Sequence, residues 1–230
     1  NSFTMIPSLY KKVPYDTLND FTSISLIASS GYAFVVNPAV LNVKDLNDFV
    51  STMKANPGKY AYGTPGKGTG HHLAMELFSQ RMGLNMLHVP HSNMGAAVNN
   101  IAGGHVHMMF APTASVLPLS KNGTLRIIAM TGAQRSPIAP ELPSIAESGL
   151  KGFDMTNWYG LLVQGGTPRD VISKLQQETA RILNLPELKE RLAGEGMTVV
   201  ASTPEQFVEF LARETAKFNR IIQSAGIKGN

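Results

Sequence analysis

The sequence contains no cysteine, which excludes disulfide bonds, thiolate nucleophiles and cysteine-ligated metals, and which is compatible with an oxidising compartment. Charged residues are also scarce: they make up 16% of the 230 residues, below the roughly one quarter typical of soluble domains. No apolar run is long enough to span a bilayer. The 43% hydrophobic content is sufficient for a core in one large or two small domains.

Acidic residues are almost absent from the middle of the chain. Between Phe49 and Pro140 the one acidic residue is Glu76, and all six histidines fall in the same window. The window carries seven basic residues, which are Lys54, Lys59, Lys67, Arg81, Lys121, Arg126 and Arg135. Such a positive field attracts anions. Because the basic residues are scattered and aromatic residues are few, nucleic acid is disfavoured as the partner, whereas a basic surface without a ligand stays open.

Catalytic and metal-binding patterns are equally sparse. The sequence has no GxSxG elbow and no HExxH motif, and the shortage of carboxylates removes the usual general acids and bases. The histidines form one adjacent pair, one pair three apart and one pair two apart: His71 and His72, His88 and His91, and His105 and His107. With Glu76 as the lone nearby carboxylate, we expect no metal and no cofactor. A histidine-rich metal-dependent hydrolase stays open as an alternative function.

Short apolar runs alternate with helically spaced segments through glycine-rich links, which predicts an α/β fold with a parallel sheet. The expected strands span residues 23–26, 32–36, 60–63, 86–89, 105–110, 125–131 and 158–163, and the expected helices span 43–55, 72–82, 94–102 and 113–120. The C-terminal part is expected to be helical, with helix starts at Thr167-Pro168 and Thr203-Pro204. Thr203 and Gln206 fit a capping box.

The stretch Tyr62–His72, YGTPGKGTGHH, places a glycine turn between an expected strand and an expected helix. In that arrangement backbone N–H groups and the helix dipole favour an anion. The Walker A pattern fails at Ala61 and Gly68, and the dinucleotide fingerprint fails at His71. Nucleotides are therefore disfavoured, whereas capture of a carboxylate and a tight turn without a ligand both stay open.

A series of short motifs along nearly the whole chain resembles one family, the Bug (TctC-type) solute-binding receptors of tripartite tricarboxylate transporters. The glycine loop resembles that family's Tyr-Gly-Ser-x-Gly-x-Gly-Ser-x-x-His-Leu, with threonines at Thr64 and Thr69 in place of the serines. The other motifs include IPSLYKKVPYD at 6–16, VVNP at 35–38, ANPGK at 55–59, HVP at 88–90, LPSIAESG at 142–149, WYG at 158–160 and GTP at 166–168. Each motif is short, and their order makes the resemblance specific.

The resemblance implies a type II periplasmic-binding-protein fold of two Rossmann-like α/β domains with a ligand cleft between them. Domain 2 would span residues 37–157. Domain 1 would comprise residues 1–36 and 158–230 and would be incomplete, without its N-terminal strands. The resemblance further implies a periplasmic receptor that is not an enzyme and that passes a small organic carboxylate to transporter membrane subunits. An effector-binding regulatory module with the same fold is the remaining alternative.

By the resemblance, the glycine loop supplies one side of carboxylate binding. The candidate ligand-binding residues are Thr64, Pro65, Gly66, Lys67, Gly68, Thr69, His91 and Ala111. Two of them depart from the family pattern, in which His91 is usually Tyr and Ala111 is usually Asp. An Asp would suit a ligand amino group, so Ala111 favours a dicarboxylate or an aromatic acid over an amino acid.

Members of the family begin well upstream of Asn1, so the resemblance implies that a signal peptide, the first strands of domain 1 and a second ligand-binding loop are missing here. Open sheet edges and uncovered apolar helix faces would follow from that. We therefore expect self-association or domain swapping of this chain, and weak or no binding of carboxylates.

Overall fold

The computed structural model describes residues 1–10, 12–17, 19–136 and 139–226, so Lys11 of the opening family motif lies outside the described residues. The chain divides into two compact units, and each is described by itself. One unit comprises Asn1–Ser30 with Asn157–Asn230, and the other comprises Gly31–Thr156. The domain assignment derived from the resemblance stays a prediction. No helix of the described residues is long and apolar enough to cross a membrane.

Strand β1, Phe21–Val36, contributes its first half to one unit and its second half to the other. The prediction of two short strands here is wrong, because Ala28 and Ser29 pair with β7 and continue the strand through the polar segment that suggested a break. Gly31 is needed within the strand: a Cβ there would lie 3.1 Å from the backbone nitrogen of Gly132.

The sheet of the unit Gly31–Thr156 has the order β3-β2-β4-β1-β5. Its other strands are β2 (Ala61–Thr64), β3 (Leu87–Pro90), β4 (Met108–Pro112) and β5 (Arg126–Met130). β2 is parallel to β3 and β4, whereas β1 is antiparallel to β4 and β5. The prediction of an all-parallel sheet is therefore wrong, since Tyr32 of β1 lies opposite Pro112 at the edge where the parallel strands end.

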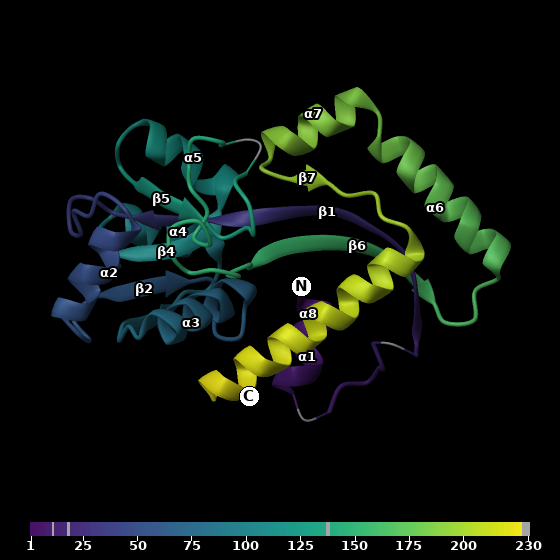
Figure 1. Ribbon diagram of the computed structural model, residues 1–230, viewed down its shortest axis with the longest axis horizontal. Coiled ribbons are helices and arrows are strands. Elements are labelled where there is room, and N and C mark those ends of the chain that lie inside the picture. Colours follow the sequence, from purple (N-terminus) through teal and green to yellow (C-terminus); the bar gives the residue numbers. More distant parts are fainter. Residues whose placement is uncertain (11, 18, 137–138, 227–230) are drawn as a thin grey trace. The chain divides into compact units, whose positions relative to one another are not determined.

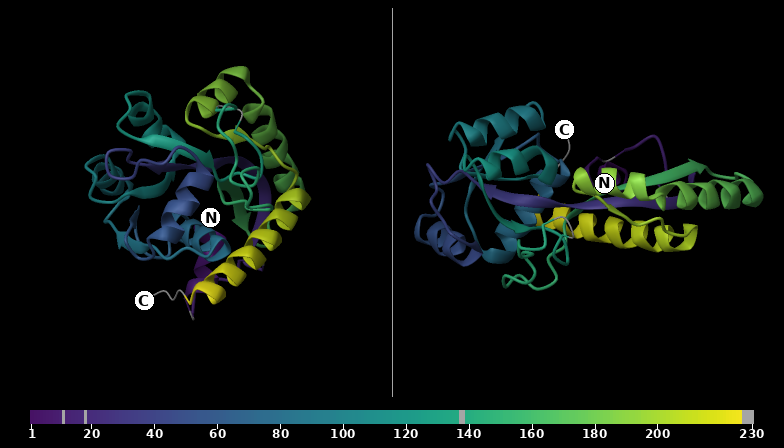
Figure 2. Two further views of the ribbon diagram at one scale, coloured as in Figure 1. Left: turned by 60° about the vertical axis from the view of Figure 1, so that its left-hand side comes forward. Right: turned by 90° about the horizontal axis from the view of Figure 1, so that it is seen from above.

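Helices cover both faces of this sheet, and the layers can be followed in Figure 1 and from two further directions in Figure 2. The helices are α2 (Leu46–Ala55), α3 (Gly70–Met82), α4 (Met94–Ala102) and α5 (Thr113–Lys121). On one face the rings of β1 and β4 meet those of α2 and α3 in a cluster of Phe34, Phe49, Phe78 and Phe110. The alternate residues of the same strands pack with α4 and α5 in a second cluster that includes Ala33, Val35, Met109, Ala111, Val98, Ile101 and Val116. The predicted α/β class is confirmed.

In the other unit the first half of β1 pairs with β6 and β7. Its elements are α1 (Ser2–Leu9), β6 (Thr156–Gln164), α6 (Arg169–Leu183), α7 (Pro186–Gly194), β7 (Thr198–Val199) and α8 (Pro204–Ala225). α8 packs against α1, and Trp158, Phe207 and Leu211 are buried together with Leu26. Gly160 leaves room for this cluster, because a Cβ there would lie 2.1 Å from the Phe207 ring.

Apart from β1, the strands and helices whose limits were predicted begin and end within three residues of those limits. The capping box at Thr203 is confirmed, since both of its hydrogen bonds to and from Gln206 are present. The predicted cap at Thr167 is wrong, because α6 begins one residue later and Pro168 occupies the N-cap position.

Candidate functional site: the glycine bend of β2 and α3

The glycine bend, residues 65–69, connects the end of β2 to the start of α3. Thr64 is buried at the strand end, Lys67 is exposed, and the other residues of the bend are half-buried. Gly66 and Gly68 have φ angles of 139° and 78°, which side-chain-bearing L-residues rarely adopt. Thr69 caps α3, its hydroxyl accepting a hydrogen bond from the His72 amide. The glycines therefore allow a tight turn that places the start of α3 close to the carboxyl end of β2.

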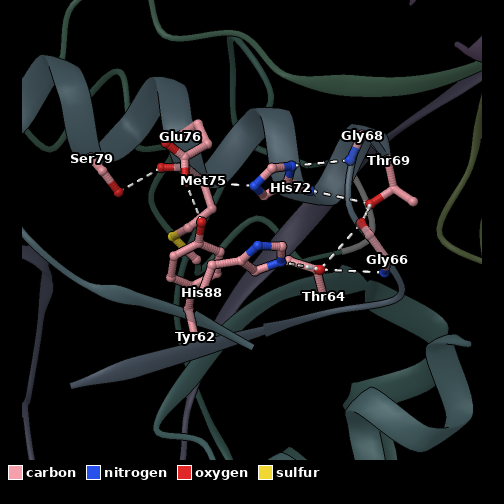
Figure 3. A network of polar contacts seen from close by, with 10 residues as sticks. All are labelled: Tyr62, Thr64, Gly66, Gly68, Thr69, His72, Met75, Glu76, Ser79 and His88. Carbon is pink, nitrogen blue, oxygen red and sulfur yellow. Dashed lines mark hydrogen bonds and ion pairs between the residues drawn. The ribbon is translucent and has the colours of Figure 1, made fainter. Parts of the chain in front are cut away.

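The amides of both glycines have acceptors inside the protein, as Figure 3 shows. The Gly68 N–H donates to Nδ1 of His72 over 3.1 Å. The Gly66 N–H donates to Oγ1 of Thr64 over 3.3 Å. These two amides are thus engaged in holding the bend.

Four other amides of the bend and of the first turn of α3 have no acceptor among the described residues, and one of them belongs to the buried Gly70. Within the described residues, no acceptor lies within hydrogen-bond reach of the N–H groups of Lys67, Thr69, Gly70 and His71. We call these four groups the free amides. Unsatisfied N–H groups at a helix start are the donors that an anion accepts from.

A stacked set of rings lies directly behind the bend. The His72 ring stacks on His88 with centroids 4.0 Å apart, and His88 stacks in turn on Tyr62 at 4.9 Å. Nε2 of His88 lies 2.7 Å from Oγ1 of Thr64. The Tyr62 hydroxyl donates to Glu76, whose Oε1 also lies 3.7 Å from Nε2 of His72. Burial and the hydrogen bond to Glu76 raise the pKa of Tyr62, so the phenol keeps its proton.

Three histidines around the bend, His71, His72 and His88, have lowered pKa values and are neutral at pH 7. Burial lowers the pKa of His72 to about 4, and the nearby Lys67 charge adds to the effect. Burial and the adjacent His72 lower the pKa of His88 to about 4. Burial against Tyr32, whose ring lies 4.4 Å away, lowers the pKa of His71 to about 4. Neutral rings can accept hydrogen bonds, whereas imidazolium ions cannot.

Three helices begin at the same sheet edge as the bend. Because β2 is parallel to β3 and β4, the three strands end together, and α3, α4 and α5 start there at Gly70, Met94 and Thr113. The positive ends of three helix dipoles therefore meet at this edge. All residues of these three helices are among those that the structure describes, and none of the helices has an acidic residue in its first turn. By contrast α2, which starts at the opposite edge, is capped by Asp45 and carries Asp48.

Buried polar atoms without partners gather at this edge as well. Nε2 of His71, Nε2 of His91 and Oγ1 of Thr113 are inaccessible to water and have no hydrogen-bond partner among the described residues. They follow β2, β3 and β4 respectively. Buried polar groups nearly always have partners, so each unsatisfied group needs an explanation. A ligand at this edge would supply acceptors or donors for them.

The structure places the predicted residues unequally with respect to the bend. His91 is brought next to it: its amide donates to the Thr64 carbonyl over 2.9 Å, and its Nε2 would lie 3.3 Å from a Cβ at Gly63. Ala111 is fully buried in the cluster that packs against α4 and α5. The ligand-binding roles of these residues stay predictions. His72 and His88 were not predicted to hold the bend, although the four-residue spacing from Gly68 to His72 could have suggested it.

No group of three or more histidine, aspartate or glutamate side chains in the described ranges could hold a metal ion. His105 and His107 fall in the expected strand 105–110, but both precede β4, which begins at Met108. Nδ1 of His107 accepts a hydrogen bond from the Ala61 amide over 3.0 Å instead. The geometry gives the metal-dependent alternative no support.

A family model described as "Tripartite tricarboxylate transporter family receptor" matches residues 1–227. The chain belongs to this family. The resemblance stated from the motifs is thereby confirmed, and the fold is that of the Bug-type periplasmic binding proteins. Members of the family are receptors and not enzymes, in agreement with the expectation for this chain.

Relatives and solved structures of the family cover nearly all of this chain. A protein from the tcbD-tcbE intergenic region of Pseudomonas sp. is 31% identical over 222 residues, which are 96% of this chain and 66% of the relative. BugT of Bordetella pertussis is 29% identical over 96% of this chain and 68% of the relative. The chain therefore spans about two thirds of the length of these curated relatives.

Among solved structures, an R. palustris protein with adipate superposes with a TM-score of 0.86 at 27% identity, covering 99% of this chain and 76% of that protein. The periplasmic binding protein BugD superposes with a TM-score of 0.84 at 26% identity, covering all of this chain and 77% of that protein.

Proposed function

We propose that this chain is the carboxylate-capturing part of an extracytoplasmic solute-binding receptor, and that the acid group binds at the glycine bend. The ligand is a small dicarboxylate or an aromatic acid. The receptor works in the periplasm and delivers its ligand to the membrane subunits of a tripartite tricarboxylate transporter. Binding occurs without chemical conversion of the ligand.

The observation that carries this proposal is the convergence of free donors at one sheet edge. The free amides, three helix starts without acidic residues and the unpartnered atoms of His71, His91 and Thr113 all lie where β2, β3 and β4 end. In open α/β sheets, ligands bind outside the carboxyl ends of the strands. An anion there would satisfy donors that otherwise have no partner.

The choice of ligand class rests on charge and on one relative. Lys67 is exposed on the bend, and the surrounding unit is depleted of acidic residues. A solved relative at 27% identity holds adipate, a six-carbon dicarboxylate. Ala111 offers no carboxylate to an ammonium group, which supports an acid without an amino group.

Calorimetric titration with matched ligands tests the proposal. Adipate and benzoate are compared with adipamide and benzamide, which keep the shape but lack the charge. We expect weak but saturable binding of at least one acid and none of its amide, with no product detectable by chromatography. Equal binding of acid and amide, or no binding of any acid at millimolar concentrations, would contradict the proposal.

A further inference from the structure

Hydrogen bonds connect both glycine amides of the bend to a histidine ring, one directly and one through Thr64. The Gly68 N–H donates directly to Nδ1 of His72. The Gly66 N–H donates to Oγ1 of Thr64, which lies 2.7 Å from Nε2 of His88, and the two rings stack at 4.0 Å. The conformation of the bend therefore depends on side chains contributed by α3 and β3, in addition to its own backbone (Figure 3).

We propose that His72 is a positioning residue for ligand capture: its Nδ1 fixes the peptide between Lys67 and Gly68 and so keeps the free amides without internal acceptors. The inference rests on the proposed function, and it assigns His72 no contact with the ligand. Without this acceptor the peptide is free to rotate, because Gly68 tolerates both signs of φ. Rotation of this peptide would change ψ of Lys67 and φ of Gly68, and so would change the directions of the free amides of Lys67 and Thr69 on either side of it.

The role requires one tautomer of His72. An Nδ1 that accepts the Gly68 N–H carries no proton, so in the neutral ring the proton resides on Nε2. Nε2 faces Oε1 of Glu76 at 3.7 Å, and the same oxygen accepts the Tyr62 hydroxyl. Glu76 thus favours the tautomer in which Nδ1 is the acceptor, as a carboxylate does for many functional histidines.

Protonation of His72 would remove the acceptor. The groups packed around the ring are Lys67 from the bend, Glu76 from α3, Tyr62 from β2 and His88 from β3. Burial and Lys67 oppose protonation, which agrees with a pKa of about 4. The acceptor is therefore present at neutral pH.

Three variants test the role. His72→Leu removes the acceptor, and His72→Asn restores an acceptor near the position of Nδ1. His107→Leu is a matched control, because His107 accepts a backbone N–H through Nδ1 over 3.0 Å in the same unit, at the other end of β2. The measurements are adipate affinity, thermal stability and the amide NMR signals of residues 66–71.

We expect His72→Leu to weaken adipate binding about tenfold and to shift the bend amides, whereas His72→Asn stays within about threefold of the natural protein. His107→Leu should lose stability comparably and bind adipate normally. Natural affinity in His72→Leu would overturn the inference, and so would equal weakening in His107→Leu.

Failure of the positioning role of His72 can be distinguished from failure of the proposed function. If the natural protein binds no acid, the proposed function is contradicted, and the positioning role is decided by hydrogen exchange instead. The Gly68 amide should be protected in the natural protein and in His72→Asn, and should exchange as fast as the free amides in His72→Leu if that variant folds. An unprotected Gly68 amide in the natural protein would overturn the role by itself.

Discussion

Gly68 occupies a backbone conformation with φ of 78° that an L-residue adopts only under strain. Gly68→Val should therefore destabilise the fold by about 1–2 kcal/mol and abolish carboxylate binding. Gly123 is a suitable control, since it has φ of 82° and open space around it, away from the bend. Urea denaturation should show a similar loss for Gly123→Val, but calorimetry should show normal binding. Loss of binding in both variants would assign the effect to general strain.

The ring signals of His72 and His88 should titrate with a pKa of about 4 rather than near the ordinary histidine pKa of 6.5. The shift arises because both rings are buried and neutral in the folded state. NMR titration of the C–H ring protons measures this directly. Midpoints above pH 6 for both rings would contradict the hydrogen-bonding scheme of the bend.

The free energy of unfolding should depend on pH because of the same two lowered pKa values. The unfolded chain binds protons at these histidines below about pH 6.5, and the folded chain binds them only below about pH 4. The free energy of unfolding is thus unaffected above pH 6.5 and falls as pH decreases toward 4, by less than about 1.4 kcal/mol per pH unit for each histidine. Urea denaturation at several pH values, compared with the His72→Asn variant, measures the share of His72.

The glycine bend was predictable from the sequence, whereas its internal pairing was not. A glycine-rich link between an apolar strand and a helical segment is a local signal, and Gly66 and Gly68 have the positive φ angles that glycine adopts readily. The acceptors of their amides come from Thr64 and from His72, one turn into α3. Which side-chain rotamer closes such a contact depends on packing, here on the stack with His88.

At the scale of the elements, the start of α5 offers a test in which stability and binding move in opposite directions. Ser115 is exposed in the first turn, which has no acidic residue and no side-chain cap. Ser115→Glu should stabilise the helix by about 0.3–1 kcal/mol and weaken adipate binding about threefold. Ser115→Gln provides the uncharged control. Unchanged affinity in Ser115→Glu, measured by calorimetry at low salt, would argue against the helix starts as part of the anion site.

Helices and strands were predicted well where local periodicity decides them, and poorly where distant pairing does. α4 matches its predicted limits because Asn93 caps it and Gly103 ends it. β1 was predicted as two strands because Ser29, Ser30 and Gly31 resemble a turn, yet pairing with β7 extends it. Its antiparallel direction against β4 and β5 leaves no trace in its own residues, so the mixed sheet could not be predicted.

At the scale of the whole molecule, the family membership was predictable because many weak motifs occur in one order along the chain, and it is confirmed over residues 1–227. The ligand was not predictable, since its identity depends on side-chain geometry around the bend. Self-association remains a prediction. Its structural support is an apolar stripe on α6, where Val171, Leu175 and Ile182 lie on one face and are 41%, 36% and 43% exposed.

Light scattering over a range of concentrations tests this self-association. The natural chain should show a mass that rises with concentration, because association covers the α6 stripe. Replacing Val171, Leu175 and Ile182 by serine should return the mass toward that of a monomer. Val208→Ser on α8 is the control, since Val208 is also exposed but lies on another helix. A natural chain that stays monomeric throughout would contradict the prediction.

The most direct test of the account is an amide NMR titration of the isotope-labelled protein with adipate. The account predicts that the signals of Lys67, Thr69, Gly70 and His71 move together and saturate, that the Gly68 amide stays bonded to His72, and that adipamide produces no such change. Saturable shifts confined to residues away from the carboxyl ends of β2, β3 and β4, or no shift with any acid, would contradict it.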